Sequence, residues 1–253
     1  MADELQVARE LADIADEIAM RYFTRAPVAE MKEDGTLVTA ADTEIETALR
    51  ARIAEVFPEH AVLGEEHGLQ GDASAPIWVL DPIDGTNNFA WGIPVFATLV
   101  ALRVGGRTEV GVVSAPALGE RYEARRGRGA RMNGEAIHVS DAASIDEARV
   151  CYASWVGWVR AGLDRQWAWI LSRCHRSRGF GDFWGHMLVA RGAADIMAEP
   201  TLRIWDVAAL EVIVEEAGGS ITDFSGKTFD DNASCLSTNG RLHGEVIRAL
   251  AGG

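Results

Sequence analysis

The sequence predicts a layered, mixed α/β fold built as one continuous domain from 253 residues. Long apolar segments in the first half are joined by the turn Gly105–Gly106, as in an antiparallel hairpin. The second half alternates short apolar runs with amphipathic helical segments. The chain contains no repeat, low-complexity tract or Pro/Ser-rich linker. We therefore expect a single domain, residues 1–253, with two lobes of approximately 1–145 and 146–253.

Helices are predicted where apolar residues recur every three or four positions. The second of these stretches ends just before Pro58, a residue that cannot continue a helix. The pair Gly218–Gly219 closes a later one. The expected helices lie at residues 3–25, 41–56, 162–174, 183–191, 206–219 and 239–250.

Strands are predicted where short apolar runs are bounded by turn residues. They are expected at residues 61–64, 77–80, 95–104, 108–116, around 119–132 and 136–140, and at 148–154, 194–199 and 233–238. The run IWVL at 77–80 is wholly apolar, so we expect a buried strand that ends where DPIDGTNNF begins.

The charge balance and the apolar runs exclude several partners. The 38 acidic and 24 basic residues give a net charge of -14, which argues against a nucleic-acid partner. No apolar run approaches the roughly 20 residues that span a bilayer, so no membrane partner is expected. The N-terminal segment mixes acids with apolar residues, unlike a secretory signal. The three cysteines have no metal-ligand spacing, and we expect a cytoplasmic protein with reduced thiols.

Acidic residues gather at four places, three of them where apolar elements meet turns. The clusters are Asp42, Glu65 with Glu66, Asp81 with Asp84, and Asp206. Ionised carboxylates are costly to bury without a partner, and hard divalent cations such as Mg²⁺ prefer oxygen ligands. We expect Glu65, Asp81 and Asp84 to bind such a cation, with the Ile83 carbonyl as a further ligand.

The residues after Asp84 suit an anion. Gly85 lets the backbone approach a ligand closely, and the amides of 85–87 could cradle a phosphate. An anion site beside a cation site is what metal-assisted phosphoryl chemistry needs. Asp42 could hold the hydroxyl of Thr86, so that the two residues orient a water.

Each of these residues also has an ordinary structural interpretation. Asp206 precedes a helix and could be only its N-cap. Asp42 could cap a helix or form a salt bridge, and Glu66 could be a surface acid. Asp, Pro and Gly are common turn residues. The complete set is more specific than any member, because capping alone does not require several acids around one Gly-Thr turn.

The segments GEE at 64–66, DPIDGTNNF at 81–89 and WDVAALEVIVEEAGG at 205–219 resemble those of the inositol monophosphatase family, as does LVTAAD at 37–42. These are Mg²⁺-dependent, lithium-sensitive phosphatases, and the resemblance extends over essentially the whole chain. It implies an α-β-α-β-α layered sandwich of the inositol monophosphatase and fructose bisphosphatase type. It also implies a homodimer and two or three Mg²⁺ ions per active site, with Mn²⁺ as a possible substitute.

The resemblance assigns roles residue by residue. The groups that match metal ligands are Glu65, Asp81, the Ile83 carbonyl, Asp84 and Asp206. Gly85 and Thr86 match the phosphate-binding turn. Asp42 and Thr86 match the pair that positions the attacking water, and Glu66 matches the neighbour of the first metal ligand. Lys32 aligns with a lysine near the catalytic loop, with a solvent-exposed salt bridge as the equal alternative.

The family's substrates include inositol phosphates, fructose bisphosphate, sulfated nucleotides and histidinol phosphate. Asp182 in RSRGFGDF, and Glu199 and Arg203 in AEPTLRIWD, occupy positions that the resemblance places near the substrate. Two acids beside the leaving group suit an alcohol that carries an ammonium. GVVSAPALGERYEARRGRGA and LVARGAADIMAEP also resemble the histidinol-phosphate phosphatase branch. The expected reaction converts L-histidinol phosphate to L-histidinol and phosphate in histidine biosynthesis.

Several alternatives stay open at this point. The chain could be an inositol-1-phosphate phosphatase or a broad-specificity monoesterase, or a Mg²⁺-responsive scaffold without activity. Asp182 could cap the helix that follows it. Trp91, or the pair Trp155 and Trp158, could stack on an imidazole, although tryptophans more often fill core or interface space.

Overall fold

The computed structural model describes residues 3–23, 29–31, 37–229 and 231–252. Its largest sheet has eight strands, which are antiparallel except for the parallel pair β3 and β5. In spatial order the strands are β10 (Glu135–Ala136), β9 (Ala130–Met132), β8 (Glu120–Arg125), β7 (Arg107–Ala115), β6 (Ala97–Val104), β5 (Ile77–Asp84), β3 (Ala61–Gly64) and β4 (Gly68–Gln70).

A second sheet has five strands from the later part of the chain. In spatial order they are β12 (Arg176–Arg178), β11 (Arg149–Tyr152), β13 (Ile196–Leu202), β15 (Ala233–Thr238) and β14 (Ser220–Thr222). Strand β11 runs parallel to both neighbours, and β15 runs antiparallel to both of its own. A small third sheet pairs β1 (Ala29–Met31) with β2 (Leu37–Thr39).

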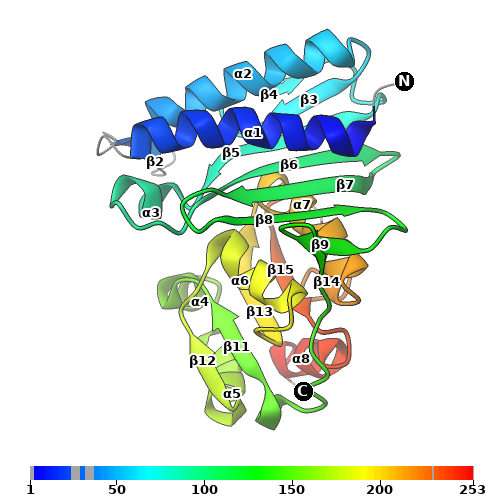
Figure 1. The fold of residues 1–253 in the computed structure, drawn as a ribbon. Helices are drawn as coiled ribbons and strands as arrows, with labels where there is room; N and C mark the ends of the chain where they lie inside the picture. The colour runs from blue at the N-terminus through cyan, green and yellow to red at the C-terminus, as the bar shows by residue number, and fades with distance from the viewer. Residues whose placement is uncertain (1–2, 24–28, 32–36, 230, 253) are drawn as a thin grey trace.

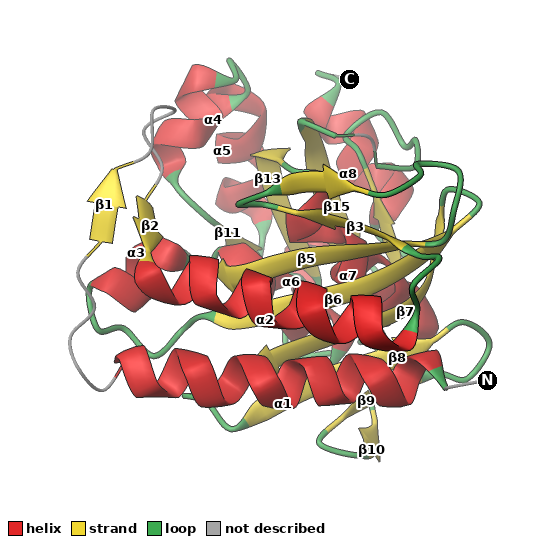
Figure 2. Ribbon diagram, turned by 90° about the horizontal axis from the view of Figure 1, so that it is seen from above, coloured by secondary structure: helices red, strands yellow, loops and turns green. Residues whose placement is uncertain are grey.

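The helices form layers above, between and below the two large sheets (Figure 1). They are α1 (Glu4–Phe23), α2 (Ala40–Val56), α3 (Thr86–Ala90), α4 (Trp155–Arg160), α5 (Asp164–Arg173), α6 (Asp182–Ala190), α7 (Ile204–Glu216) and α8 (His243–Leu250), with a 3-10 turn at Ile145–Glu147. Figure 2 shows α1 and α2 side by side across one face of the eight-stranded sheet.

Alternate residues of β5 explain why the large sheet is covered on both faces. Successive side chains of a strand point to opposite faces. Trp78 and Leu80 pack with α1 and α2 in one apolar core, whereas Val79 packs with α6 and α7 in another. The strand is therefore apolar at every position before Asp81, as the run IWVL predicts.

The five-stranded sheet is likewise covered on both faces. Val150 and Ile196 belong to a core with Trp158 of α4, Trp167 of α5 and Val246 of α8. Helix α6 packs against the other face of β11 and β13, next to α7. The order helices, sheet, helices, sheet, helices confirms the predicted α-β-α-β-α sandwich.

Most predicted elements are present, and the differences have local causes. Strand β5 continues through the aspartates to Asp84 instead of ending at residue 80. Beyond Ala136, the segment 137–140 forms no strand. The last helix begins at His243 instead of residue 239, because the Asn239 carboxamide oxygen accepts the backbone N–H of Leu242 and forms a turn there.

Sequence patterns missed several short elements. Helix α4 has six residues, and β4, β12 and β14 have three residues each. Elements of this length show too little periodicity to be detected. In the part of the chain that the structure describes, no helix is both long enough and apolar enough to cross a bilayer.

Candidate active site

Three carboxylates from distant parts of the sequence meet where β5 ends and α7 begins. One oxygen atom from each of Asp81, Asp84 and Asp206 lies within 4.8 Å of the other two. Asp81 and Asp84 lie at the C-terminal end of strand β5, and Asp206 lies in the first turn of α7. Because α7 packs against this sheet, the strand end and the helix start come together.

The end of β5 is irregular, and this irregularity places both aspartates. The pairing register between β5 and β6 shifts between Asp81 and Asp84, as at a bulge, which redirects side chains. The carbonyl of Pro82 accepts a hydrogen bond from Thr98 Oγ1 at 2.7 Å. Gly85 then turns the chain with φ of 81°, and a Cβ atom there would lie 3.0 Å from the Val95 carbonyl oxygen. Both the backbone angle and the space require glycine.

Asp206 both stabilises a helix start and belongs to the carboxylate group. Its Oδ2 accepts the backbone N–H of the N-cap residue Arg203 at 2.7 Å, at the start of α7. Asp206 is thus not the N-cap that the structural interpretation expected, because Arg203 has that position and Asp206 is the third helical residue. The bond to Arg203 nevertheless stabilises the start of the helix. It does not exclude a second role, because a carboxylate has about four acceptor sites.

The carboxylates destabilise one another in their charged forms. Burial, followed by the charges of Glu65 and Asp84, raises the pKa of Asp81 well above its usual range. Burial and then the charge of Asp182 have the same effect on the pKa of Asp84. Burial also raises the pKa of Asp206 to about 7. These acids need a positive charge to stay ionised together at neutral pH.

A divalent cation fits this arrangement. The Oδ1 atom of Asp81 is buried, and no donor in the described chain reaches it. An unpaired buried carboxylate oxygen beside two further carboxylates forms the all-oxygen ligand set that hard cations prefer. When bound there, such an ion supplies Lewis-acid polarisation of a phosphate and compensates the acidic charge. Asp81, Asp84 and Asp206 are the residues that would hold it.

Glu65 and Glu66 lie on the turn between β3 and β4. The backbone N–H of Glu65 is 3.3 Å from the Leu80 carbonyl oxygen, so Glu65 lies beside Asp81 across the parallel strands. Glu65 is outside the 4.8 Å group of described acids. After burial, its charge is the next largest influence that raises the pKa of Asp81. The turn therefore brings Glu65 close to the site.

The expected pairing of Asp42 with Thr86 is not the one in the structure. Asp42 Oδ2 accepts the backbone N–H and the hydroxyl of Thr39 at 2.8 and 2.6 Å. The Thr86 hydroxyl donates its single proton to the Ile83 carbonyl at 2.9 Å, so it cannot donate to Asp42 as well. Asp42 thus caps α2, as the alternative interpretation held. Burial, and then the charges of Glu66 and Glu65, raise its pKa to about 7, although the hydrogen bonds from Thr39 oppose the shift.

Asp182 and Glu199 form a second acidic pair next to the first. Asp182 begins α6 with φ of 55°, and its successor Phe183 donates its backbone N–H to Asp84 Oδ2 at 2.6 Å. Burial and then the charge of Glu199 raise the pKa of Asp182 to about 7. Burial raises the pKa of Glu199 to about 7 as well. The structure thus brings together the two acids that the sequence places 17 positions apart.

Two residues around this acidic pair were missed by sequence reasoning. Asn88 Nδ2 donates to Asp182 Oδ2 at 3.2 Å and to the Val95 carbonyl at 2.9 Å. His186 is fully buried, and its Nε2 lies 3.8 Å from Glu199 Oε1. Asn88 belongs to the motif DPIDGTNNF, which was the available signal. His186 lies on α6 four residues after Asp182, which places both on one face of that helix.

Arg203 has partners of its own at the start of α7. Its guanidinium lies over the Trp205 ring, 4.9 Å from the ring centroid, and its Nη2 is 3.5 Å from Asp231 Oδ2. The predicted substrate contact of Arg203 stays a prediction. Lys32 lies outside the described residues.

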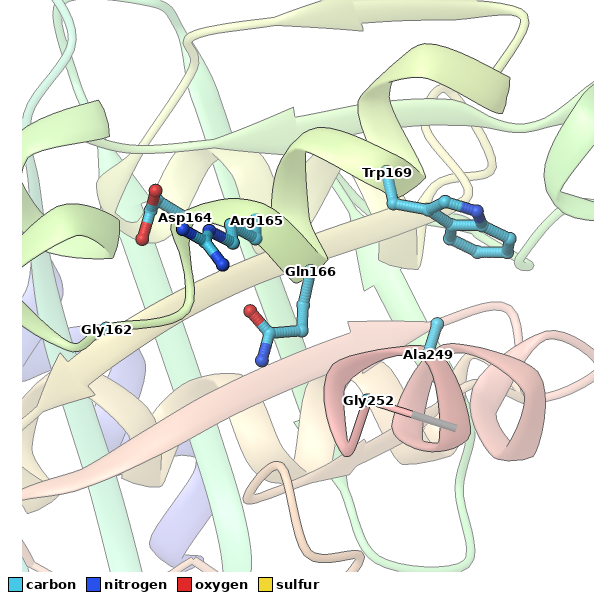
Figure 3. A pocket seen from close by; sticks show the side chains of 7 residues that line it. All are labelled: Gly162, Asp164, Arg165, Gln166, Trp169, Ala249 and Gly252. Atoms are coloured by element: carbon cyan, nitrogen blue, oxygen red, sulfur yellow. The ribbon is translucent and has the colours of Figure 1, made fainter.

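Trp158 and a surface cavity lie apart from the acidic site. Trp158 is buried and stacks on Trp167 with ring centroids 4.2 Å apart, so it fills the core. Trp91 is 71% exposed. A surface cavity of about 540 Å³ lies between α5 and α8 (Figure 3). Trp169, Ala249 and Gly252 are among its lining residues, which include none of the acids described above.

Comparisons with known proteins agree with this geometry. The sequence model of the inositol monophosphatase family matches residues 1–252. A histidinol-phosphatase of Mycobacterium tuberculosis is 42% identical over 99% of this chain and 99% of its own length. A histidinol-phosphatase of Streptomyces coelicolor is 39% identical over 98% of this chain and 97% of its own. A solved Thermotoga maritima IMPase has a TM-score of 0.89 and 32% identity, covering 99% of this chain and 98% of that one.

Proposed function

Because this chain belongs to the inositol monophosphatase family, we propose that its substrate is L-histidinol phosphate, which it hydrolyses to L-histidinol and phosphate in histidine biosynthesis. The chain is a metal-dependent phosphatase of that family. The substrate follows from two kinds of support. One is the likeness to two histidinol-phosphatases over nearly the full length of each. The other is the chemistry of the site.

The observation that carries the proposal is the second acidic pair beside the carboxylate group. Glu199 is close enough to raise the pKa of Asp182, and the charges of both acids raise the pKa of Asp84. A leaving alcohol with an ammonium group compensates these charges in a partly desolvated site. Inositol is an uncharged polyol and offers no such compensation. The pair therefore favours a cationic leaving group over a neutral one.

The cation in the proposal is Mg²⁺, with two or three ions per active site and Mn²⁺ as a substitute. The proposed ligands are Asp81, Asp84, Asp206, Glu65 and the Ile83 carbonyl. The carbonyl already accepts the Thr86 hydroxyl, and its second lone pair is available for a metal ion. Oxygen ligands of this kind and number suit Mg²⁺, which keeps part of its water shell.

The remaining site residues keep their proposed roles around the phosphate. The backbone at Gly85 and Thr86 holds the phosphate at the first turn of α3, where N–H groups lack intrahelical partners. Asp42 and Thr86 position the attacking water, with Asp42 oriented by Thr39, and Glu66 stands next to the metal ligand Glu65. In this arrangement Thr86 joins Asp42 only after its hydroxyl has left the Ile83 carbonyl. Arg203 is proposed to contact the substrate from the exposed start of α7.

A second candidate substrate is inositol 1-phosphate. The solved Thermotoga maritima IMPase superposes with a TM-score of 0.89, so the same scaffold accommodates enzymes of that type. A minor activity on inositol 1-phosphate is compatible with the metal site, which contacts the phosphate shared by both substrates. The acidic pair decides between the two leaving groups.

The proposal treats residues 1–253 as one domain with lobes of approximately 1–145 and 146–253. It is supported by α6 and α7, which follow residue 145 and pack on the large sheet formed before it. We further propose a homodimer, as the family resemblance implies, and a cytoplasmic location. The three cysteines are unpaired, as is usual in a reducing compartment.

The test is phosphate release from L-histidinol phosphate and from inositol 1-phosphate, side by side, with Mg²⁺ and with EDTA. We expect kcat/KM to favour histidinol phosphate strongly and the activity to be lost in EDTA. A preference for inositol 1-phosphate would keep the metal chemistry and overturn the argument from Asp182 and Glu199. Activity that survives complete metal removal would overturn the metal assignment itself.

A further inference from the structure

Helix α2 carries a buried carboxylate that has no part in the site as described so far. Glu46 is fully buried and lies one helical turn after Asp42, on the same face of α2. A buried charge is stable only when it is paired and hydrogen-bonded. The partners of Glu46 therefore indicate what the residue does.

All the described partners of Glu46 belong to its own helix or to the turn that carries Glu65 and Glu66. Its Oε2 accepts the backbone N–H of Glu66 at 2.8 Å, and its Oε1 accepts that of His67 at 3.1 Å. The His67 ring nitrogen Nδ1 is also 3.1 Å from Oε1. Arg50, one further turn along α2, donates Nε–H to Oε1 at 2.7 Å. The carboxylate thus binds the backbone of the turn directly.

Arg50 holds the same turn from both of its ends. Its guanidinium donates to the Val62 carbonyl at 3.3 Å, in β3, and to the Gly68 carbonyl at 2.5 Å, at the start of β4. Its planar fork allows these contacts together with the bond to Glu46. Asp42, Glu46 and Arg50 lie on one face of α2, so the face that carries Asp42 also holds the turn of Glu65 and Glu66.

Gly64 shows that the close approach of Glu46 depends on the sequence of the turn. A Cβ atom at Gly64 would overlap with the carboxylate of Glu46. Gly64 pairs with Leu80 of β5, the residue before Asp81. The glycine therefore leaves space for the Glu46 carboxylate at the point where the turn passes the acidic strand.

We propose that Glu46 is a positioning residue, which orients the Glu65–Glu66 turn toward the carboxylates of Asp81 and Asp206 for metal binding. Glu46 acts through the backbone amides of the turn and does not touch the metal ion. This inference rests on the metal site of the proposed function and is independent of the leaving group.

The test compares Mg²⁺ binding, measured by calorimetry without substrate, in the wild-type protein and in Glu46→Gln. Gln keeps the shape of the Glu46 side chain but turns its NH₂ group toward one of the N–H or guanidinium partners. This breaks at least one of the hydrogen bonds that the carboxylate accepts. We expect the dissociation constant for Mg²⁺ to rise about tenfold, as is usual when a group that orients a ligand is altered. At saturating Mg²⁺ we expect KM for the phosphate ester to stay within about twofold of the wild-type value on the same grounds.

Asp195→Asn is the matched control. Asp195 is also fully buried, and its Oδ2 accepts the backbone N–H and Nε–H of Arg149 at 2.6 and 3.0 Å. It lies in the five-stranded part of the fold, so its loss lowers the melting temperature without changing Mg²⁺ binding. A lowered melting temperature in Glu46→Gln with wild-type Mg²⁺ affinity would reduce Glu46 to a structural residue and overturn the proposal.

Gly64→Ala provides an independent test that leaves the chemistry of Glu46 intact. The added methyl group pushes the carboxylate away from the turn, and we expect the same weakening of Mg²⁺ binding. This variant also carries the test if Glu46→Gln does not fold. Wild-type affinity in Gly64→Ala would contradict the proposal. If the wild-type protein itself binds no Mg²⁺, the metal function fails instead, which separates the two inferences.

Discussion

The Nε2 atom of His186 and the Oε1 atom of Glu199 lie 3.8 Å apart, and both are buried without a hydrogen-bond partner in the described chain. The other ring nitrogen of His186 is 2.7 Å from Ser237 Oγ. The distance is too long for a hydrogen bond, yet the two groups face each other at the edge of the acidic pair. His186 is therefore buried beside the acidic pair without a hydrogen bond to Glu199.

We expect His186 to make the protein sensitive to acid. Burial lowers the pKa of His186 to about 3 from an ordinary value of 6.5. Between pH 6.5 and 3, the unfolded chain therefore binds up to one more proton at this residue than the folded chain does. Neutral His186 thus supports the full free energy of unfolding above pH 6.5, and this support is lost as the pH falls toward 3. His186→Gln removes this pH-dependent contribution to the free energy of unfolding. Between pH 7.5 and 5.5, the wild type is expected to lose about 1 kcal/mol more unfolding free energy than the variant.

Urea unfolding of both proteins at the two pH values checks this expectation. Glu199 and Asp182, which face His186, are present in both proteins, so their own titration largely cancels in the comparison. Equal pH dependence of the two unfolding free energies would show that folding does not shift the pKa of His186.

Asp84→Asn is expected to keep the fold and abolish turnover. The asparagine oxygen still accepts the backbone N–H of Phe183, which Asp84 Oδ2 binds now. A buried charge that its neighbours oppose is removed, so the melting temperature in EDTA should rise. The stabilisation that Mg²⁺ adds to the wild type should shrink, since a ligand stabilises only the state that binds it. Wild-type activity in the purified variant would contradict the metal assignment.

Asp182→Asn is expected to act on the leaving group. Asn tolerates the φ of 55° at this position better than Ala does, and the substitution removes only the charge. KM for an amine-bearing phosphate should rise about tenfold, the size of one charge-assisted contact. KM for inositol 1-phosphate should change little. Equal effects on both substrates would remove Asp182 from the specificity argument.

Asn88→Ala tests whether Asp182 needs its neighbour. The side-chain amide of Asn88 fixes the Asp182 carboxylate relative to the strand-side carbonyl of Val95. We expect KM for the amine-bearing substrate to rise less than in Asp182→Asn, and the Mg²⁺ dependence of the activity to stay unchanged. In the double variant, KM for this substrate should rise no more than in Asp182→Asn alone, because both changes remove the same interaction. Additive losses in KM would show that Asn88 acts independently.

The sequence indicates which acidic residues come together in the fold, but not the contacts that they make. Asp81, Asp84 and Gly85 are encoded within one turn, whose residue types report a local backbone shape. The contacts of Thr86 and Asp42 depend on which neighbour each polar group finds after folding, and periodicity contains no information about that choice. Asn88 and Asp182 are 94 positions apart, and Glu46 faces a turn about 20 residues away. Such pairings arise from tertiary packing, which one sequence does not display.

The position of α7 has a consequence for the newly synthesised chain. The strands of the large sheet are complete by Ala136, but one of their apolar faces is covered by α6 and α7, whose last residue is Glu216. While the ribosome is still adding the segment between Ala136 and Glu216, no helix covers the side chains of Val79, Leu99 and Val113. A fragment of residues 1–145 should therefore bind a hydrophobic dye and require a chaperone to remain dispersed, whereas the full chain should not. A fragment that is monomeric and excludes the dye would show that the first half folds by itself.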